Sequence, residues 1–179
     1  LRIVNGCEEP IWIAHLANVG VGPGQQNSKI EPREFHDFPT PGALGAARYW
    51  PKMGCDETGD NCELGGSGGP GEHCSEIDSD YSHCAPPVDT KFEGTYGMPD
   101  VPCDPAQANT MNGCDFMDIS LVDGWTLPFK LEIAGGPCIG SGSLEPVTHV
   151  DCSGLSLDRC PKDDNLGDGA VNMQAINPN

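Results

Sequence analysis

The chain has 179 residues, with 24 glycines, 17 prolines and 10 cysteines, and its formal net charge is −18. This length suits one large domain, or one domain with a small appendage, and the composition is typical of a loop-rich, disulfide-stapled secreted protein rather than a cytosolic enzyme. The acidity argues against nucleic acids and anionic membranes as partners, because both are bound through lysine and arginine, and it leaves neutral carbohydrate, cations and basic proteins.

The first third of the chain predicts short strands. Residues 2–5 and 11–15 are expected to form two strands joined at Pro10. Residues 34–38 alternate with period two, and residues 46–50 form a further strand that we expect Pro51 to end.

The remainder predicts a long loop and then more strands. Residues 55–87 hold four cysteines among Gly, Ser and Asp and lack an apolar pattern, which indicates a disulfide-held loop region. Strands are expected again at 116–122 and 127–133. No helical stretch is convincing, and no run approaches the ~18 apolar residues of a membrane span, so the sequence predicts an all-β sandwich. No charged-then-apolar leader opens the chain, so we expect Leu1 to lie near a mature N-terminus after signal removal.

Two carboxylates interrupt the apolar segment 115–129, DFMDISLVDGWTLPF. Alternation places Phe116 and Asp118 on one strand face, and Met117 and Ile119 on the other, which is expected to be core. Asp123 begins an Asp-Gly turn signal and need not share the Met117 face. An acid in a strand faces water, finds a partner or lines a cleft, because burying it alone is too costly.

Several motifs, in the same order along the chain, resemble those of the thaumatin-like proteins, the pathogenesis-related family five. The motifs are IVNGC and PIWIA between 3 and 14, AARYW before Cys55, TGDNC at 58–62, Pro86-Pro87 with Thr90-Lys-Phe-Glu93, DISLVDGWTLPF at 118–129, and the spacing of Cys152 and Cys160 before Pro161. The resemblance runs from about Ile3 to Pro161 and implies a flattened β-sandwich with long disulfide-bonded loops. We expect a sandwich domain at 1–134, with a disulfide-rich loop region at 55–114, and a partial or reduced second domain and tail at 135–179.

The resemblance also implies an acidic cleft lined by one Arg, one Glu and three Asp. Position by position these correspond to Arg48, Glu93, Asp118 and Asp123, while the fifth residue has no counterpart in this sequence. Trp125, beside the cleft acids, is expected either to bind substrate or to join the core.

The chain departs from the family pattern in three ways. An insertion bracketed by Cys103 and Cys114 lies between Glu93 and Asp118, and much of the cysteine-rich second domain and the last strand are missing beyond Pro161. The usual partners of the four remaining cysteines lie in the part that has no counterpart here, so these four pair among themselves, stay unpaired, or belong to a sequence that is a piece of a longer chain: Cys7, Cys138, Cys152 and Cys160. The preferred local bridges, among those that the cysteine count allows, are Cys55–Cys62, Cys74–Cys84 and Cys103–Cys114.

The four cleft residues allow three interpretations. Arg48 could pair with the carboxylates only to hold strands together, or the set could bind sugar by hydrogen bonding. In a third interpretation Glu93 acts as general acid, with Asp118 or Asp123 as nucleophile or base, in glycoside hydrolysis. We favour a secreted, extracellular or cell-wall-associated protein that binds a β-1,3-glucan-like polysaccharide in a defence-like role. The alternatives are a structural subunit of an extracellular assembly, with another protein as partner, and a weak endo-β-1,3-glucanase.

Aromatic rings could stack on sugar, and two cysteine-histidine pairs suggest metal. The candidate rings are Trp12, Trp50, Trp125, Tyr49, Tyr81 and Tyr96. Trp12 and Trp50 lie in predicted strands and are expected in the core, whereas Tyr96 could be exposed. For His73-Cys74 and His83-Cys84, disulfide bonding is favoured over zinc, and the Asp163–Asp168 segment lacks the spacing of a calcium loop. We therefore expect no metal and no cofactor.

Overall fold

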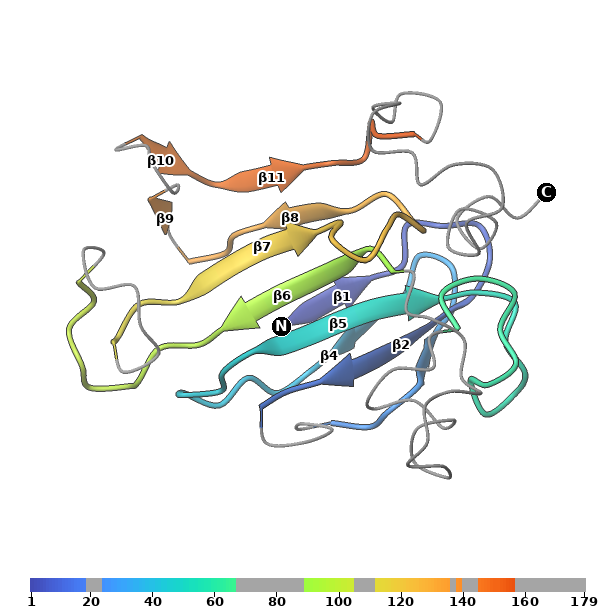
Figure 1. Cartoon of the computed structure of the whole chain (residues 1–179), viewed down its shortest axis with the longest axis horizontal. Coiled ribbons are helices and arrows are strands. Elements are labelled where there is room, and N and C mark those ends of the chain that lie inside the picture. The colour runs from blue at the N-terminus through green and yellow to red at the C-terminus, as the bar shows by residue number, and fades with distance from the viewer. Residues whose placement is uncertain (19–23, 67–88, 105–111, 136–137, 140–144, 157–179) are drawn as a thin grey trace.

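The computed structural model describes residues 1–18, 24–66, 89–104, 112–135, 138–139 and 145–156. These residues form short strands and no helix, which confirms the all-β prediction (Figure 1). Consequently none of the described residues forms an apolar helix long enough to cross a bilayer. The strands are β1 (Arg2–Val4), β2 (Ile11–Leu16), β3 (Ser28–Ile30), β4 (Phe35–Asp37), β5 (Ala47–Lys52), β6 (Lys91–Thr95), β7 (Phe116–Ser120), β8 (Lys130–Glu132), β9 (Cys138–Ile139), β10 (Pro146–Val147) and β11 (His149–Asp151).

The largest sheet has five antiparallel strands in the order β3-β2-β5-β6-β7. Side chains alternate between its two faces. One face carries Ile13, Tyr49 and Phe92, which belong to the hydrophobic core. The opposite face carries Arg48 and Glu93, which lie opposite each other on β5 and β6.

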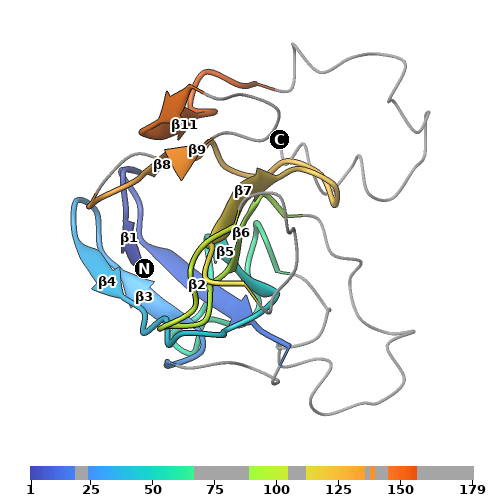
Figure 2. The same cartoon turned by 90° about the vertical axis from the view of Figure 1, so that its left-hand side faces the viewer.

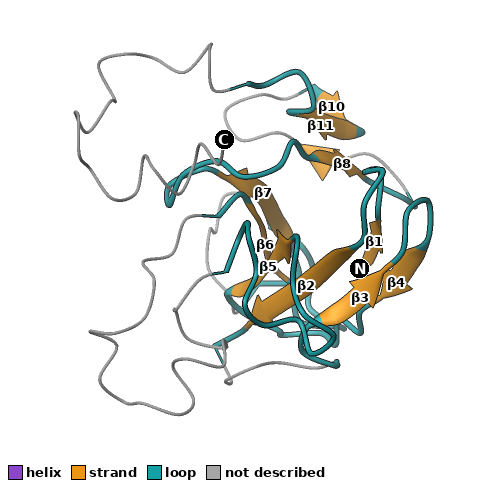
Figure 3. Cartoon of the chain, turned by 90° about the vertical axis from the view of Figure 1, so that its right-hand side faces the viewer, coloured by secondary structure: helices purple, strands orange, loops and turns teal. Residues whose placement is uncertain are grey.

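A second layer covers the apolar face of this sheet and makes the fold a sandwich. Figures 2 and 3 show β1 and β4 facing β5, β6 and β7 across the interior. Tyr49 lies at the centre of the core, with ring centroids 5.2 Å from Phe38 and 6.2 Å from Phe92. Partly buried apolar residues on β1 and around β8 complete the packing: Leu1, Ile3, Leu127, Phe129 and Leu131. The described residues therefore form the β-sandwich that the sequence predicts.

Strand boundaries differ from the sequence expectation at several points. Strand β5 continues through Pro51 to Lys52, so the prediction that Pro51 ends it was wrong. The register of β5 with β6 covers only residues 47–49, and the missing N–H of Pro51 therefore falls where β5 has no partner on that side. Strand β7 ends at Ser120 rather than residue 122, and Val122 is 90% exposed. The strand expected at 127–133 is shortened to β8.

Two of the three expected disulfides are confirmed. Cys55 bonds to Cys62, and Cys103 bonds to Cys114. The expected Cys74–Cys84 bridge lies outside the described residues. Cys7 and Cys152 carry free thiols, which for these two agrees with the unpaired alternative. The domain boundary at residue 134 stays a prediction, and β8 pairs with β11 across it.

Candidate functional site

Three of the four expected cleft residues lie side by side on the sheet face that points away from the core. The register pairs Arg48 of β5 with Glu93 of β6, and Glu93 with Asp118 of β7. Directly opposite residues in antiparallel strands have Cβ atoms about 5 Å apart on the same face. Arg48, Glu93 and Asp118 therefore form one row, which we call the ladder. The side chains of Arg48 and Glu93 are 40% and 36% exposed, so a ligand can reach the row from solvent.

The ladder carries two carboxylates and one guanidinium group. Nε of Arg48 lies 3.8 Å from Oε1 of Glu93, which is an ion pair but too long for a hydrogen bond. Burial raises the pKa of Asp118, and the negative charge of Glu93 raises it further. The ladder therefore holds one carboxyl group, that of Asp118, that retains a proton more readily than an ordinary aspartate does. The role of Glu93 as the acid stays a prediction.

Replacing Asp118 with asparagine is expected to stabilise the fold at neutral pH. A carboxyl group whose pKa is raised by folding costs stability once it ionises, and this cost appears as the pH rises from the ordinary value of 3.8 through the folded-state pKa. In urea unfolding, D118N should be more stable than wild type at neutral pH and equal to it below pH 3.8. A difference of the same size at both pH values would contradict an origin in ionisation, and Glu34→Gln, at an exposed acid away from the ladder, is the control.

Asp123 forms an ion pair with a buried lysine, Lys91, which precedes the ladder residue Glu93 by two positions on β6. Lys91 shares the face of Glu93, and its side chain is only 6% exposed. The Lys91 ammonium forms an ion pair with Asp123 and lies 3.6 Å from Oδ2 of Asp89, a side chain that is 1% exposed. We call Asp89, Lys91 and Asp123 the lysine clamp.

Two hydrogen bonds from backbone amides to threonine hydroxyl groups reinforce the clamp. The amide of Thr90 donates to Oγ1 of Thr126 over 3.1 Å, and the amide of Thr126 donates to Oγ1 of Thr90 over 2.9 Å. These bonds and the clamp fasten the turn after β7 to the start of β6. Sequence reasoning missed Lys91, although its spacing of two residues from Glu93 was the available signal for a shared face.

A comparison with protein families identifies the chain. The model of the thaumatin family matches residues 5–177. The chain belongs to the thaumatin family. Two curated plant relatives are thaumatin-like protein 1 of Arabidopsis thaliana, 29% identical over 96% of this chain, and zeamatin of Zea mays, 28% identical over 89% of this chain. These matches cover 60% and 57% of the relatives, so the chain spans about three fifths of their length.

A solved structure of the thaumatin-like xylanase inhibitor TLXI is also similar to this chain. It has 20% sequence identity and a TM-score of 0.46, and the match covers 71% of each chain.

Most of the candidate stacking rings that the structure describes lie inside the protein. Trp12 and Trp50 are 6% and 3% exposed, as predicted for core residues. Tyr96 is 8% exposed, so its expected exposure was wrong, because its amide bonds to Leu44 and its ring joins the core cluster. Trp125 is half-buried, and its Nε1 atom has no hydrogen-bond partner. Tyr81 lies outside the described residues.

Phe116 supplies the exposed ring nearest to the ladder in sequence. It is 38% exposed and lies two residues before Asp118 on the same face of β7. Alternation already placed these two side chains together, but the sequence did not indicate that the ring would be exposed.

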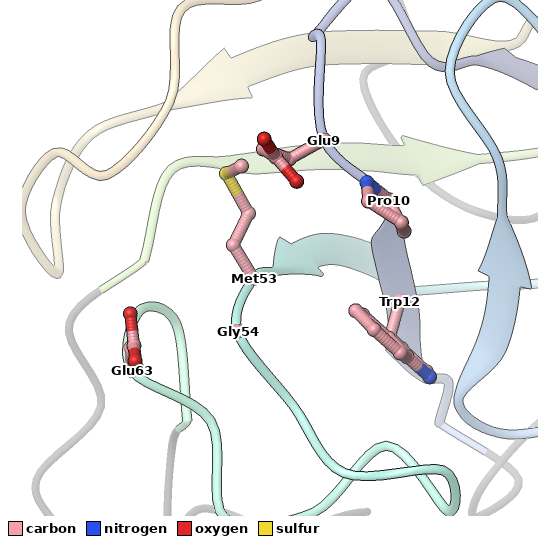
Figure 4. Close-up of a pocket in the computed structure, with 6 residues that line it drawn as sticks. All are labelled: Glu9, Pro10, Trp12, Met53, Gly54 and Glu63. Atoms are coloured by element: carbon pink, nitrogen blue, oxygen red, sulfur yellow. The ribbon is translucent and has the colours of Figure 1, made fainter.

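The described residues include no cluster of three or more His, Cys, Asp or Glu side chains that could hold a metal ion. A cavity of about 330 Å³ lies elsewhere, lined by Glu9, Pro10, Trp12, Met53, Gly54 and Glu63 (Figure 4). It contains no ladder residue, so the acidic cleft with its fifth member stays a prediction.

Proposed function

We propose that the ladder binds a neutral cell-wall polysaccharide, of the β-1,3-glucan type, in a secreted defence-type protein. The observation that carries this proposal is the register that aligns Arg48, Glu93 and Asp118 on an accessible sheet face. Guanidinium and carboxylate groups donate to and accept from sugar hydroxyls, and the partly exposed Phe116 ring offers an apolar surface on the same face. Membership in the thaumatin family and the disulfide bonds support the defence role and the extracellular location.

Asp123 plays a different part in this proposal from the one expected from sequence. Its carboxylate is engaged by Lys91, so binding is assigned to the ladder and the orientation of the neighbouring turn to the clamp.

A pull-down with insoluble β-1,3-glucan tests the proposal. The double variant Glu93→Gln with Asp118→Asn should lower the bound fraction about tenfold or more, because it removes both charged acceptors of the ladder. Glu34→Gln, at an exposed acid on the other layer, should bind as wild type does. Binding by the double variant equal to wild type would overturn the assignment.

Hydrolysis is a second candidate, favoured by the raised pKa of Asp118 beside Glu93. Glu93 and Asp118 lie directly opposite each other, with Cβ atoms about 5 Å apart, and a retaining glycosidase uses two such neighbouring carboxyl groups, the protonated one as acid and the ionised one as nucleophile. Release of reducing ends from laminarin by wild type, abolished in Glu93→Gln, supports this candidate. Equal release by the two proteins opposes it.

A further inference from the structure

The cavity beside Trp12 is separate from the ladder. Trp12 pairs with Lys52 in the register of β2 and β5, whereas Arg48 pairs with Leu16. Four residues of strand between Arg48 and Lys52 correspond to roughly 13 Å. The cavity is therefore a site distinct from the ladder.

Both walls of the cavity are fixed by contacts away from its interior. One wall is a hairpin in which Met53 and Leu64 bridge, the amide of Glu63 donates to the carbonyl of Met53 over 3.0 Å, and the Cys55–Cys62 disulfide closes the loop. On the other wall, the buried Asn5 side chain donates to the carbonyl oxygen of Glu9 over 2.9 Å. These constraints exist without a ligand, so the site is preorganised.

The position of the Glu63 side chain requires that residue 54 has no side chain of its own. Gly54 has a φ of 64°, and a Cβ atom there would lie 2.8 Å from Cγ of Glu63. The side chain of Glu63 therefore lies directly over the Gly54 backbone, at the edge of the cavity. Figure 4 shows Glu9 and Glu63 at different places around the cavity, with the Met53 side chain between them and the Trp12 ring on the side of Pro10.

The lining has a definite chemistry. Its apolar lining comes from Pro10, Trp12 and Met53, and the Nε1 atom of Trp12 lies at the end of the indole farther from Met53 and Gly54 (Figure 4). Within the described part of the chain, neither Glu9 nor Glu63 has an ion-pair partner. The nearby cation Lys29, whose Nζ lies 5.3 Å from the centre of the Trp12 ring, is paired with Glu31 at 2.8 Å.

We propose that this cavity binds an organic cation, namely an ammonium or guanidinium group carried on an aliphatic stem. The charged head would lie between Glu9 and Glu63, and the methylene groups would contact Met53, Pro10 and the edge of Trp12. Two carboxylates are too few oxygen ligands for calcium, and the nearly buried indole leaves little ring surface for a sugar to stack on. The same chemistry is offered by a free alkyl polyamine and by a lysine or arginine side chain of a partner protein.

Titration of the folded chain with hexylamine, followed by NMR chemical shifts of the Trp12 indole and the Met53 methyl group, tests the proposal. Hexanol, which has the same stem without the charge, is the ligand control. We expect saturable shifts with hexylamine and at least about tenfold weaker effects with hexanol, because a charge-assisted pair is lost. Equal responses to the two ligands would overturn the proposal.

Variants locate the site and identify the source of the cation. Glu9→Gln with Glu63→Gln should weaken hexylamine binding about tenfold, whereas Glu57→Gln, on the same hairpin but outside the lining, should not change it. Gly54→Ala keeps every charge but displaces Glu63, so it should also weaken binding while the disulfide stays intact by mass. Unchanged binding in both the double variant and G54A would refute the site. Agmatine binding tighter than an arginine-containing peptide indicates a free amine as ligand, and the reverse order indicates a protein partner.

Discussion

Replacing Lys91 with methionine is expected to lower the free energy of unfolding by about 3–5 kcal/mol, because it removes one partner of a buried ion pair and takes away the ammonium that both Asp89 and Asp123 face. Lys91 is 6% exposed, and the Asp89 side chain beside it is 1% exposed. Water therefore cannot replace the ammonium at Asp89. Urea denaturation at neutral pH measures the loss, and the turn that carries Asp123 should show the largest changes in amide chemical shift.

A surface lysine provides the matched control. Lys29 and Glu31 form a pair of 2.8 Å whose side chains are 46% and 56% exposed, so Lys29→Met should cost less than about 1 kcal/mol. Adding Asp89→Asn to Lys91→Met should restore part of the lost stability, because the buried carboxylate that faced the ammonium is then gone as well. A loss in Lys91→Met no larger than in Lys29→Met would show that the clamp does not stabilise the fold.

The ladder residues could be named from the sequence because the resemblance to the thaumatin-like proteins assigns them to one cleft, and alternation places Asp118 on the face of its strand that is not expected to be core. The clamp could not be predicted in the same way. Strand β6 was missed because Lys91-Phe-Glu-Gly-Thr has one large apolar residue and a glycine, and a lysine in such a segment normally lies at the surface. Its burial depends on Asp89 and Asp123, which come from segments 34 residues apart.

Tertiary contacts also explain why the cavity beside Trp12 could not be predicted. Glu9 and Glu63 look like ordinary surface acids in the sequence, and the pairing of Met53 with Leu64 brings Glu63 to the cavity that Glu9 also lines. The expectation that Tyr96 could be exposed failed for the same reason, because the core in which its ring is buried is built from other strands. Residues that depend on distant partners carry no local pattern.

The neighbouring residues Arg48 and Tyr49 are expected to separate function from stability. Tyr49 is 2% exposed in the centre of the core, so Tyr49→Ala should lower the free energy of unfolding by about 3–5 kcal/mol through lost contacts and a cavity. Arg48 points to the opposite face, is 40% exposed and lies 3.8 Å from Glu93, so Arg48→Met should change stability by less than about 1 kcal/mol.

Glucan binding should respond in the opposite order. Arg48→Met removes a hydrogen-bond donor of the ladder and should weaken binding about tenfold, whereas folded Tyr49→Ala, assayed well below its unfolding midpoint, should bind nearly as wild type does. Urea unfolding and the glucan pull-down, performed on the same two preparations, measure both effects. If Arg48→Met lost stability as Tyr49→Ala does and retained its binding, the guanidinium would hold the strands together instead of contacting sugar.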